Sequence, residues 1–365
     1  MRAISATANV TATATVRRRA ARAAPLAVVH LALAGAAVGA CGNFEDVSTV
    51  LDLRVLGIKA EPPEIYVDRS MLASQTDPFV STFTALVVDP RGAGRPVSYS
   101  AIACPREIDT VTAATGRNGV VCEHNVPGMT PTSLDIISPD TPAETTDPGP
   151  EHQISFELSV PPPLLELAFM LDPFGAQGFQ LPIVVQLELG AGTESVVATK
   201  RVIFSQQLDD RPAQAPNQNP VPGSIRVYPA RDAQRLPIDP MVIDDGNPIE
   251  LPPGGQLWFE PMDTPREGYS TRLLTRDNPP QVITQDVEKE TLRFAFFATA
   301  GTFAPPETTT VKSLLRDEQA EPHLESQYTA PAARPDNPMV TVWIVTHDER
   351  GGASWVRRQL TIGAP

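Results

Sequence analysis

The sequence VTVWIVTHDERGGASW, residues 340–355, decides the fold class of this chain. Its first part, Val340–Thr346, is rich in β-branched and aromatic residues, which predicts a strand, and a second strand is expected at Trp355–Ile362. Between them lies a polar stretch that contains Gly351 and Gly352, the composition of a turn. The segment therefore predicts a β-hairpin that closes the chain.

The middle of the chain carries a similar pattern, which is the main evidence for an internal duplication. Leu181–Leu189 leads through Gly190-Ala191-Gly192 to a further apolar segment at Val196–Phe204. Each half thus ends on a strand, a glycine-bearing turn and a closing strand. Because the same arrangement occurs twice, we expect the two halves to share a fold.

Other strand candidates are distributed over both halves. They are Val50–Ile58, Phe79–Val88, Val97–Ala103, Ile154–Val160, Ile225–Tyr228, Gln256–Glu260 and Leu292–Thr299. One short helix is expected after Pro161–Pro163, and helices do not otherwise alternate with strands. This pattern favours an all-β protein with two immunoglobulin-like antiparallel β-sandwich domains.

The first strand candidate contains an irregularity. Its apolar positions fall on odd residue numbers from Leu51 to Val55 and then on even numbers at Leu56 and Ile58, on either side of Gly57. A side chain that changes face in this way indicates an extra residue in the ladder. We therefore predict a β-bulge in an edge strand.

A polar, proline-rich segment divides the chain. Residues 206–223, QQLDDRPAQAPNQNPVPG, have the composition of a stiff interdomain linker. The segment separates an expected first domain at residues 50–205 from an expected second domain at 224–365. Each half has enough strands to bury a core of its own and is expected to fold alone.

Residues 1–40 have the three parts of a secretory leader in the required order. The basic cluster Arg17–Arg22 precedes the apolar run Leu26–Val38, and small residues follow before Cys41. The site Val38-Gly39-Ala40-Cys41 is similar to a bacterial lipobox, in which the cysteine thiol takes a diacylglycerol. The apolar run is short for a stable transmembrane helix. We therefore expect removal of the leader and a lipid on Cys41.

The expected lipid sets the location of the protein. Residues 41–49 would form a lipidated tether, and the membrane would be bound through this N-terminal lipid. Gly42 follows the cysteine in place of an Asp, which by resemblance to enterobacterial sorting rules indicates the outer membrane. The protein would face either the periplasm or the cell surface.

Charge excludes one class of partner. The formal charge of the whole chain is −14, and without the leader 24 basic and 43 acidic side chains remain, a charge of −19. Such a surface repels the phosphates of nucleic acids, whose binding needs clustered Lys and Arg. We expect no nucleic-acid partner.

Two cysteines remain once Cys41 carries lipid. Cys104 and Cys122 would both lie in an exported domain, in a compartment that oxidises thiols. We therefore predict a disulfide between them, with two buried free thiols as the alternative.

The entry segment LDLRVLGIKAEPPEI (51–65), the hairpin at 340–355 and the lipobox together resemble uncharacterised bacterial lipoproteins with immunoglobulin-like domains. The resemblance covers about half of the mature chain. It implies a sandwich fold and an outer-membrane address, and it supplies no catalytic residues. The cysteine and tryptophan pattern of antibody domains is missing from this sequence.

Motifs for catalysis and metal binding are absent from the sequence. It has no Gly-x-Ser-x-Gly elbow, phosphate-binding loop, HExxH helix or paired CxxC motif. His124, His152, His323 and His347 are far apart in the chain, so a zinc site would need three of them to converge. We expect no catalytic residues and no cofactor.

One loop offers possible calcium ligands. Asp244, Asp245 and Asn247 supply oxygen atoms at loop spacing around Gly246. The remaining EF-hand ligands and their closing Glu are missing, so a solvated turn is the favoured interpretation and a calcium site the alternative.

Two further groups of residues have a structural and a functional interpretation. His347-Asp348-Glu349-Arg350 could support acid–base chemistry, but its position before two glycines favours a turn. Trp258, Trp343 and Trp355 could stack on a carbohydrate if they shared an exposed face, whereas tryptophans in a small sandwich usually pack in the core.

These observations favour a non-enzymatic function. We expect a membrane-anchored binding, adhesion or structural module of the envelope, with an unknown envelope protein or glycan as partner. An envelope hydrolase with paired carboxylates is one alternative, which two close, buried carboxylates of raised pKa would support. An accessory subunit of an envelope complex is the other.

Overall fold

The computed structural model describes residues 46–363 except for 69, 92–94, 105–106, 112–117, 123–135, 138–150, 172–179, 207–214, 235, 244–247, 275–281, 288 and 312–323. The leader, Cys41 and the three calcium candidates Asp244, Asp245 and Asn247 therefore lie outside the described residues. Residues from Asp46 onward cluster into one compact unit. Within the described part, no helix is long and apolar enough to cross a membrane.

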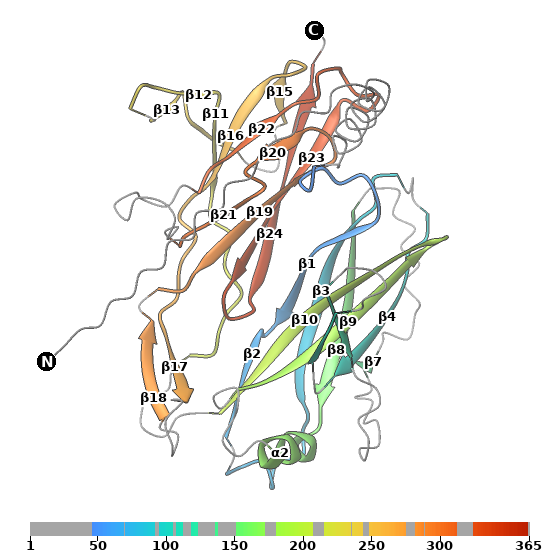
Figure 1. The fold of residues 1–365 in the computed structure, drawn as a ribbon, viewed down its shortest axis with the longest axis vertical. Coiled ribbons are helices and arrows are strands. Elements are labelled where there is room, and N and C mark those ends of the chain that lie inside the picture. The colour runs from blue at the N-terminus through green and yellow to red at the C-terminus, as the bar shows by residue number, and fades with distance from the viewer. Residues whose placement is uncertain are drawn as a thin grey trace, which may run out of the picture. The chain divides into compact units, whose positions relative to one another are not determined.

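Most of the described chain forms β-strands in several antiparallel sheets (Figure 1). The first half contains two four-stranded sheets, which we call the first sheet pair. One sheet has the order β1 (Arg54–Glu61), β3 (Phe79–Val88), β8 (Glu151–Val160), β7 (Ile136–Ile137). The other has the order β2 (Glu64–Val67), β10 (Glu194–Gln206), β9 (Gln180–Ala191), β4 (Ser98–Cys104).

The core of the first sheet pair is filled from both sheets. Phe83 of β3 and Phe156 of β8 stack with ring centroids 5.1 Å apart. Leu187 and Phe204 enter the same cluster from the opposite sheet. Strand β8 alternates between buried and exposed residues along most of its length, as its sequence predicted.

The second half contains two five-stranded sheets, the second sheet pair. One has the order β14 (Met241–Ile243), β11 (Ile225–Tyr228), β16 (Gln256–Pro261), β22 (Ser326–Thr329), β20 (Thr302–Ala304). The other has the order β15 (Ile249–Leu251), β24 (Ala353–Ile362), β23 (Met339–Asp348), β19 (Leu292–Ala298), β21 (Glu307–Thr309).

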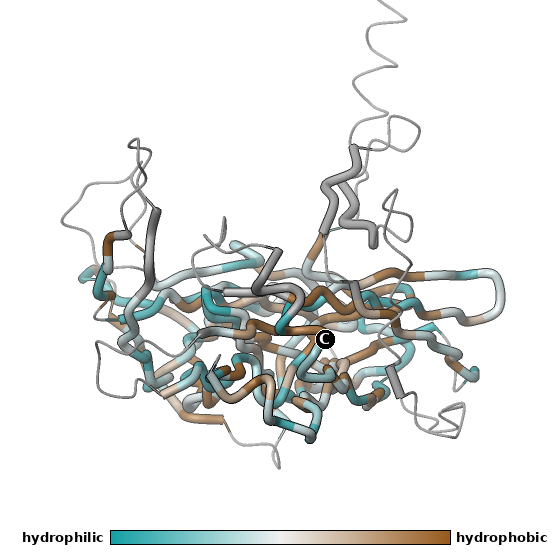
Figure 2. The backbone as a smooth tube through the Cα atoms, turned by 90° about the horizontal axis from the view of Figure 1, so that it is seen from below, coloured by the Kyte–Doolittle hydropathy of each residue, from teal (hydrophilic) through white to brown (hydrophobic). Residues whose placement is uncertain are grey.

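Aromatic side chains from both sheets fill the second core. Phe259 and Phe303 contact edge to face with centroids 5.4 Å apart, and Phe296 lies 5.3 Å from Phe303. Figure 2 shows hydrophobic stretches along many of the strands and hydrophilic residues at many of the turns. Each sheet pair therefore has its own hydrophobic core.

The remaining elements are short. Three two-stranded ribbons are present, and the single described helix follows the first core strands where it was expected. They are β5 (Glu107–Val111) with β6 (Asn118–Cys122), β12 (Ala230–Arg231) with β13 (Pro237–Ile238), β17 (Tyr269–Leu274) with β18 (Val282–Val287), and α2 (Pro162–Leu171).

The sequence correctly predicted both closing hairpins and the bulge. Strand β9 pairs with β10 and β23 pairs with β24, both antiparallel. The intervening turns contain Gly192 and Gly351 with φ of 63° and 96°, a backbone conformation that glycine adopts without strain. In β1, an edge strand, the register with β3 shifts between Val55 and Gly57.

One feature of the predicted fold is wrong, because the pairing is not antiparallel throughout. Strand β2 lies parallel to β10, and β15 lies parallel to β24. In each half the chain crosses early from one sheet to the other. It passes from β1 to β2 in the first half and from β14 to β15 in the second, and the strand after the crossing pairs with the last strand of that half. Strands β2 and β15 have only four and three residues, and their parallel partners lie far along the chain, where local sequence does not reveal them.

Candidate functional site

An apolar cluster, which we call the seam cluster, joins the two sheet pairs. Its buried members are Val50, Leu56, Leu86, Val88, Trp343 and Val345. Successive side chains of a strand point to opposite faces. In β23, Val342 and Ile344 therefore enter the second core, while Trp343 and Val345 reach the seam cluster. This explains why the four consecutive residues Val342–Val345 are all apolar.

Polar contacts surround the seam cluster. The indole Nε1 of Trp343 donates to the carboxylate of Glu151 at 2.9 Å, from β23 to β8. Upstream of β1, the Val50 amide donates to the Ala298 carbonyl at 2.8 Å, and the Ala298 amide donates to the Ser48 carbonyl at the same distance. The seam therefore combines apolar burial with backbone and side-chain hydrogen bonds.

The described half of the predicted linker, residues 215–223, forms hydrogen bonds with both halves of the chain. Asn217 is fully buried, its amide nitrogen donates to Glu64 at 2.7 Å, and its Nδ2 donates to Asp348 at 3.0 Å. Asn219 donates to the Ala60 carbonyl at 2.6 Å and accepts from the Ala353 amide at 3.0 Å. The described part of the predicted stiff linker, which we call the connection, is thus packed against both halves of the chain.

A buried ion pair lies next to this connection. The Glu64 side chain is 4% exposed and that of Arg350 is 10% exposed, and the Arg350 guanidinium binds the Glu64 carboxylate. The other carboxylate oxygen accepts from the Ser205 hydroxyl at 2.5 Å. Arg350 also lies over the Tyr269 ring, 4.8 Å from its centroid. A buried charge pair needs such additional hydrogen bonds to offset desolvation.

Asp348 holds the turn from which Arg350 projects. Its Oδ1 accepts from the amides of Arg350 at 2.8 Å and Gly352 at 2.6 Å. A Cβ at Gly352 would lie 2.1 Å from the Asp348 carboxylate, so glycine is required there. The turn interpretation of residues 347–350 is therefore confirmed for Glu349 and Arg350, whereas His347 and Asp348 are the last residues of β23, and Arg350 has an additional role in the ion pair.

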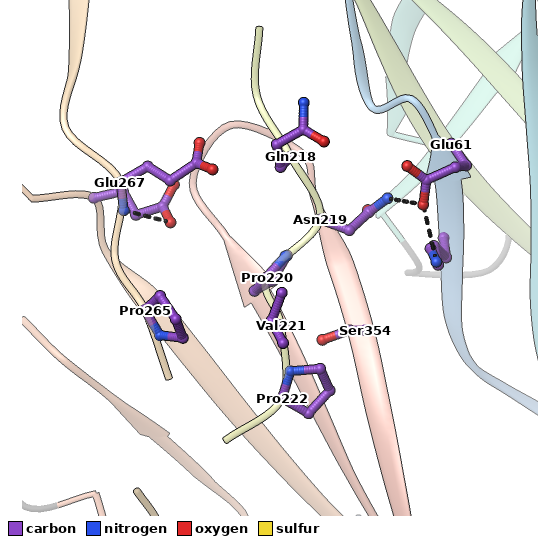
Figure 3. Close-up of a pocket in the computed structure, with 11 residues that line it drawn as sticks. Glu61, Gln218, Asn219, Pro220, Val221, Pro222, Pro265, Glu267 and Ser354 are labelled. Atoms are coloured by element: carbon purple, nitrogen blue, oxygen red, sulfur yellow. Dashed lines mark hydrogen bonds and ion pairs between the residues drawn. The ribbon is translucent and has the colours of Figure 1, made fainter. Parts of the chain in front are cut away.

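A cleft of about 470 Å³ opens at this junction. Its apolar wall is formed by Pro220, Val221, Pro222 and Pro265 (Figure 3). Its polar lining comes from both sheet pairs and from the connection, and consists of Lys59, Glu61, Gln218, Asn219, Glu267, Glu290 and Ser354. The volume lies within the range of about 300–1,000 Å³ that is typical of small-ligand sites.

The lining carboxylates differ in their surroundings. Glu61 is paired with Lys59 at 2.9 Å and accepts from Asn219 at 3.0 Å. Glu267 lies 3.5 Å from Arg350 Nη1, a long contact. Glu61 is therefore already neutralised by a cation within the cleft, and Glu267 is held more loosely.

Glu290 is the most unusual of the lining residues. It is 2% exposed, its Oε1 accepts from the Glu267 amide at 3.1 Å, and no described residue donates to its Oε2. Burial, aided by the negative charges of Asp348 and Glu267, raises the pKa of Glu290 to about 7. The side chain can thus gain or lose a proton near neutral pH.

Two basic groups near the junction are also perturbed by burial. Burial lowers the pKa of Lys200 to about 8, and the negative charge of Asp348 opposes this shift. Burial lowers the pKa of His347 to about 4, and the positive charges of Lys200 and Arg293 act in the same direction. His347 is therefore neutral at physiological pH.

The structure separates the other residues that the sequence singled out. His152 is buried in β8 and His347 lies in β23, while His124 and His323 are outside the described residues. Among the described residues, no group of three or more His, Cys, Asp or Glu could hold a metal ion. The zinc interpretation therefore has no support from the described part of the chain.

The three tryptophans do not form one platform. Trp343 is fully buried and Trp355 packs against the seam cluster. Trp258 lies in β16, where it stacks on Tyr228 with centroids 6.3 Å apart, and the Arg231 guanidinium lies 4.0 Å from its ring centroid. The packing interpretation is thus confirmed for Trp343.

The predicted disulfide stays a prediction. Cys104 ends β4 and Cys122 ends β6, but their side chains lie outside the described residues. The backbone places Cys104 opposite Val184 and Cys122 opposite Glu107, in two different sheets.

Sequence reasoning missed Glu64, Asn217 and Glu290. Each is a polar residue in a segment without periodicity, and its burial results from contacts with residues distant in the chain, such as Glu64 with Arg350, 286 positions apart. The one local signal was the pair of asparagines in the proline-rich connection. Asparagine side chains can replace the backbone donors that proline lacks.

The comparisons with known proteins identify no family. No protein-family model matches the chain. No curated protein matches it. Weakly similar solved structures include the adhesin InvE of Yersinia pseudotuberculosis, which is 9% identical, with 84% of this chain and 58% of that chain covered and a TM-score of 0.18.

Two further solved structures have the same low level of similarity. Dimeric latent PorU from Porphyromonas gingivalis is 9% identical, with 86% of this chain and 24% of that chain covered and a TM-score of 0.19. An endo-fucoidan hydrolase of glycoside hydrolase family 107 is 9% identical, with 88% of this chain and 31% of that chain covered and a TM-score of 0.16. The chain thus spans 58% or less of the length of these three proteins. At these TM-scores the similarities carry no argument about function.

Proposed function

We propose that the mature chain is a lipid-anchored, non-enzymatic binding module of the bacterial outer membrane, built from two immunoglobulin-like β-sandwiches. The lipobox at Val38–Cys41 supports the anchor. The shared topology supports the sandwiches, because in each half the last strand pairs antiparallel with the strand before it and parallel with an early strand. The ligand would be an envelope protein or glycan.

The observation that carries the binding function is the cleft at the junction. It is lined by Glu61 from the first sheet pair, by Ser354 from the second and by Asn219 from the connection. Ligand sites occur preferentially where domains meet. A cleft formed jointly by both halves gives a physical reason for the buried network that holds them together, because a binding site is more selective when its walls are fixed.

Site-specific photocrosslinking in intact cells tests this proposal. Val221 lines the cleft and is 65% exposed, while Val197 of β10 is 56% exposed and is not among the lining residues. A benzophenone side chain at position 221 is expected to form a discrete adduct with an envelope component, and the same group at 197 is the matched control. No adduct from 221, or the same adduct from both positions, would refute binding at the cleft.

A second candidate function is hydrolysis with paired carboxylates. The raised pKa of the buried Glu290 and the presence of Glu267 in the same cleft favour it, because a general acid must hold its proton near neutral pH. Purified protein would then cleave an envelope polysaccharide, and E290Q would abolish turnover. An absence of turnover by the unmodified protein on isolated cell-wall and outer-membrane glycans would eliminate this candidate.

A further inference from the structure

We propose that the cleft binds a cationic group carried on an apolar stem, as in the side chain of lysine or arginine or in a free polyamine. This inference rests on the proposed binding function and specifies the ligand class for the same site. Its central residue is Glu290, which is almost fully buried, lines the cleft and has one oxygen without a hydrogen-bond donor among the described residues. Most buried polar side-chain atoms in proteins have a hydrogen-bond partner, and a bound donor would satisfy this oxygen.

The charge of the lining favours a cation over a neutral ligand. Three carboxylates line the cleft against one cation, Lys59, and this cation is already paired with Glu61. Glu267 is the second available acceptor, because its contact with Arg350 is long at 3.5 Å. Hydrogen bonds between charged partners are about twice as strong as those between neutral groups.

A second polar group in the lining also lacks a partner among the described residues. Ser354 is 8% exposed, and its hydroxyl has no hydrogen-bond partner among the described residues. A hydroxyl can accept as well as donate, so it suits the second or third N–H of an ammonium or guanidinium. Two unpartnered polar atoms in the lining of one cleft therefore point to a ligand with several donors.

The apolar part of the lining can contact the apolar stem of the proposed ligand. Pro220, Val221, Pro222 and Pro265 present apolar surface to the cleft (Figure 3). Long cationic side chains pack their methylenes on such surface and place the charged end at polar groups. Among the described lining residues none is aromatic, so the stacking surface that many sugar sites use is missing.

Titration calorimetry on the mature chain with C41S tests this inference. The probes are Nα-acetyl-lysine methylamide, Nα-acetyl-arginine methylamide and spermidine, with the norleucine analogue as the uncharged control of similar shape. The measurements are made at pH 8, where Glu290 is ionised. We expect saturable binding of at least one cationic probe and no binding of the norleucine analogue. Binding by the amino-acid probes alone would identify a polypeptide as the source, and binding by spermidine alone a free amine.

The variant E290Q separates the proposed site from general attraction to an acidic protein. Gln keeps the oxygen that accepts from Glu267 and removes the charge, so the fold is retained. We expect at least roughly tenfold weaker binding, the effect of one hydrogen bond to a charged group. E250Q, at an exposed glutamate of β15 outside the cleft, should leave the affinity unchanged.

Three outcomes would overturn the inference. They are the failure of all cationic probes, equal binding of the norleucine analogue, and equal weakening by E290Q and E250Q. If any one of them occurs while the crosslink from position 221 persists, the proposed ligand class is wrong and the binding function stands. Loss of both results would refute the two proposals together.

Discussion

At the scale of single residues, burial at the junction determines which side chains carry charge. The pKa of His347 is lowered to about 4 by desolvation of its half-buried side chain and by the positive charges of Lys200 and Arg293. We expect its imidazole NMR signals to remain constant from pH 8 to about 5 and to titrate only below that. In K200Q the midpoint should move upward, because one repelling charge is removed. A midpoint near 6.5 in the unmodified protein would contradict this description of the junction.

Glu290 should make the folded protein less stable as the pH rises. Its folded pKa of about 7 lies above its ordinary value of 4.5, so its contribution is fully present below about pH 4.5 and is lost as the pH rises through 7. Gln does not titrate. The free energy of unfolding of the wild type relative to E290Q, measured by urea denaturation, should therefore decrease from pH 5 to pH 8. A constant difference would show that Glu290 has no raised pKa.

Cys41 is the residue on which the proposed location depends. The C41S variant should incorporate no labelled palmitate and should leave the membrane fraction, because the buried methylenes of the acyl chains, at about 0.8 kcal/mol each, would be lost. The C104S variant is the control, since it removes a different cysteine and should still be labelled. Palmitate incorporation in C41S would contradict the lipid anchor.

At the scale of elements, the sequence predicted strands where periodicity or length made them visible. Strands β3 and β11 have the predicted boundaries, and the bulge beside Gly57 follows from the parity of its neighbours. The short parallel strands β2 and β15 were missed, because each begins directly after a proline, Pro63 or Pro248, which indicates a loop. Their partners are the last strands of each half, which local sequence cannot reveal.

The same limit applies to the candidate site. The polar residues at 347–350 predicted a turn, and Asp348 does accept hydrogen bonds from the backbone amides of Arg350 and Gly352. Nothing local indicated that Arg350 would meet Glu64, which lies 286 positions away in the other half, or that Glu290 would pack beside Glu267. Composition at 206–223 predicted a stiff linker but did not show that Asn217 and Asn219 in its described part would bind to both halves.

Gly57 of β1 provides a test at this scale. A Cβ at this position would lie 3.0 Å from Cγ1 of Val345 and 3.6 Å from the Trp355 ring. The variant G57V should therefore destabilise the protein by about 1–3 kcal/mol through overpacking of the seam cluster. G190A in β9 is a milder control, since its Cβ would meet only the Ser98 hydroxyl, at 3.1 Å. Equal stability of G57V and wild type in chemical denaturation would show that the seam is not packed in solution.

At the scale of the whole molecule, two separate cores are connected by a third cluster. The two cores agree with the expectation that each half buries its own apolar surface. The seam cluster, the Trp343–Glu151 hydrogen bond and the Glu64–Arg350 ion pair add an interface between the two halves. The domain boundaries inferred from the sequence remain a prediction, and the interface makes independent unfolding of the halves unfavourable.

The two sheet pairs form one unit with a cleft at their junction. Scanning calorimetry of the mature C41S chain tests this most directly, because a shared interface couples the unfolding of both cores. We predict one transition with equal calorimetric and van't Hoff enthalpies, and a lower midpoint that is still a single transition for E151Q, which weakens the bond to Trp343. Two resolved transitions in the unmodified protein, unchanged by E151Q, would contradict the account.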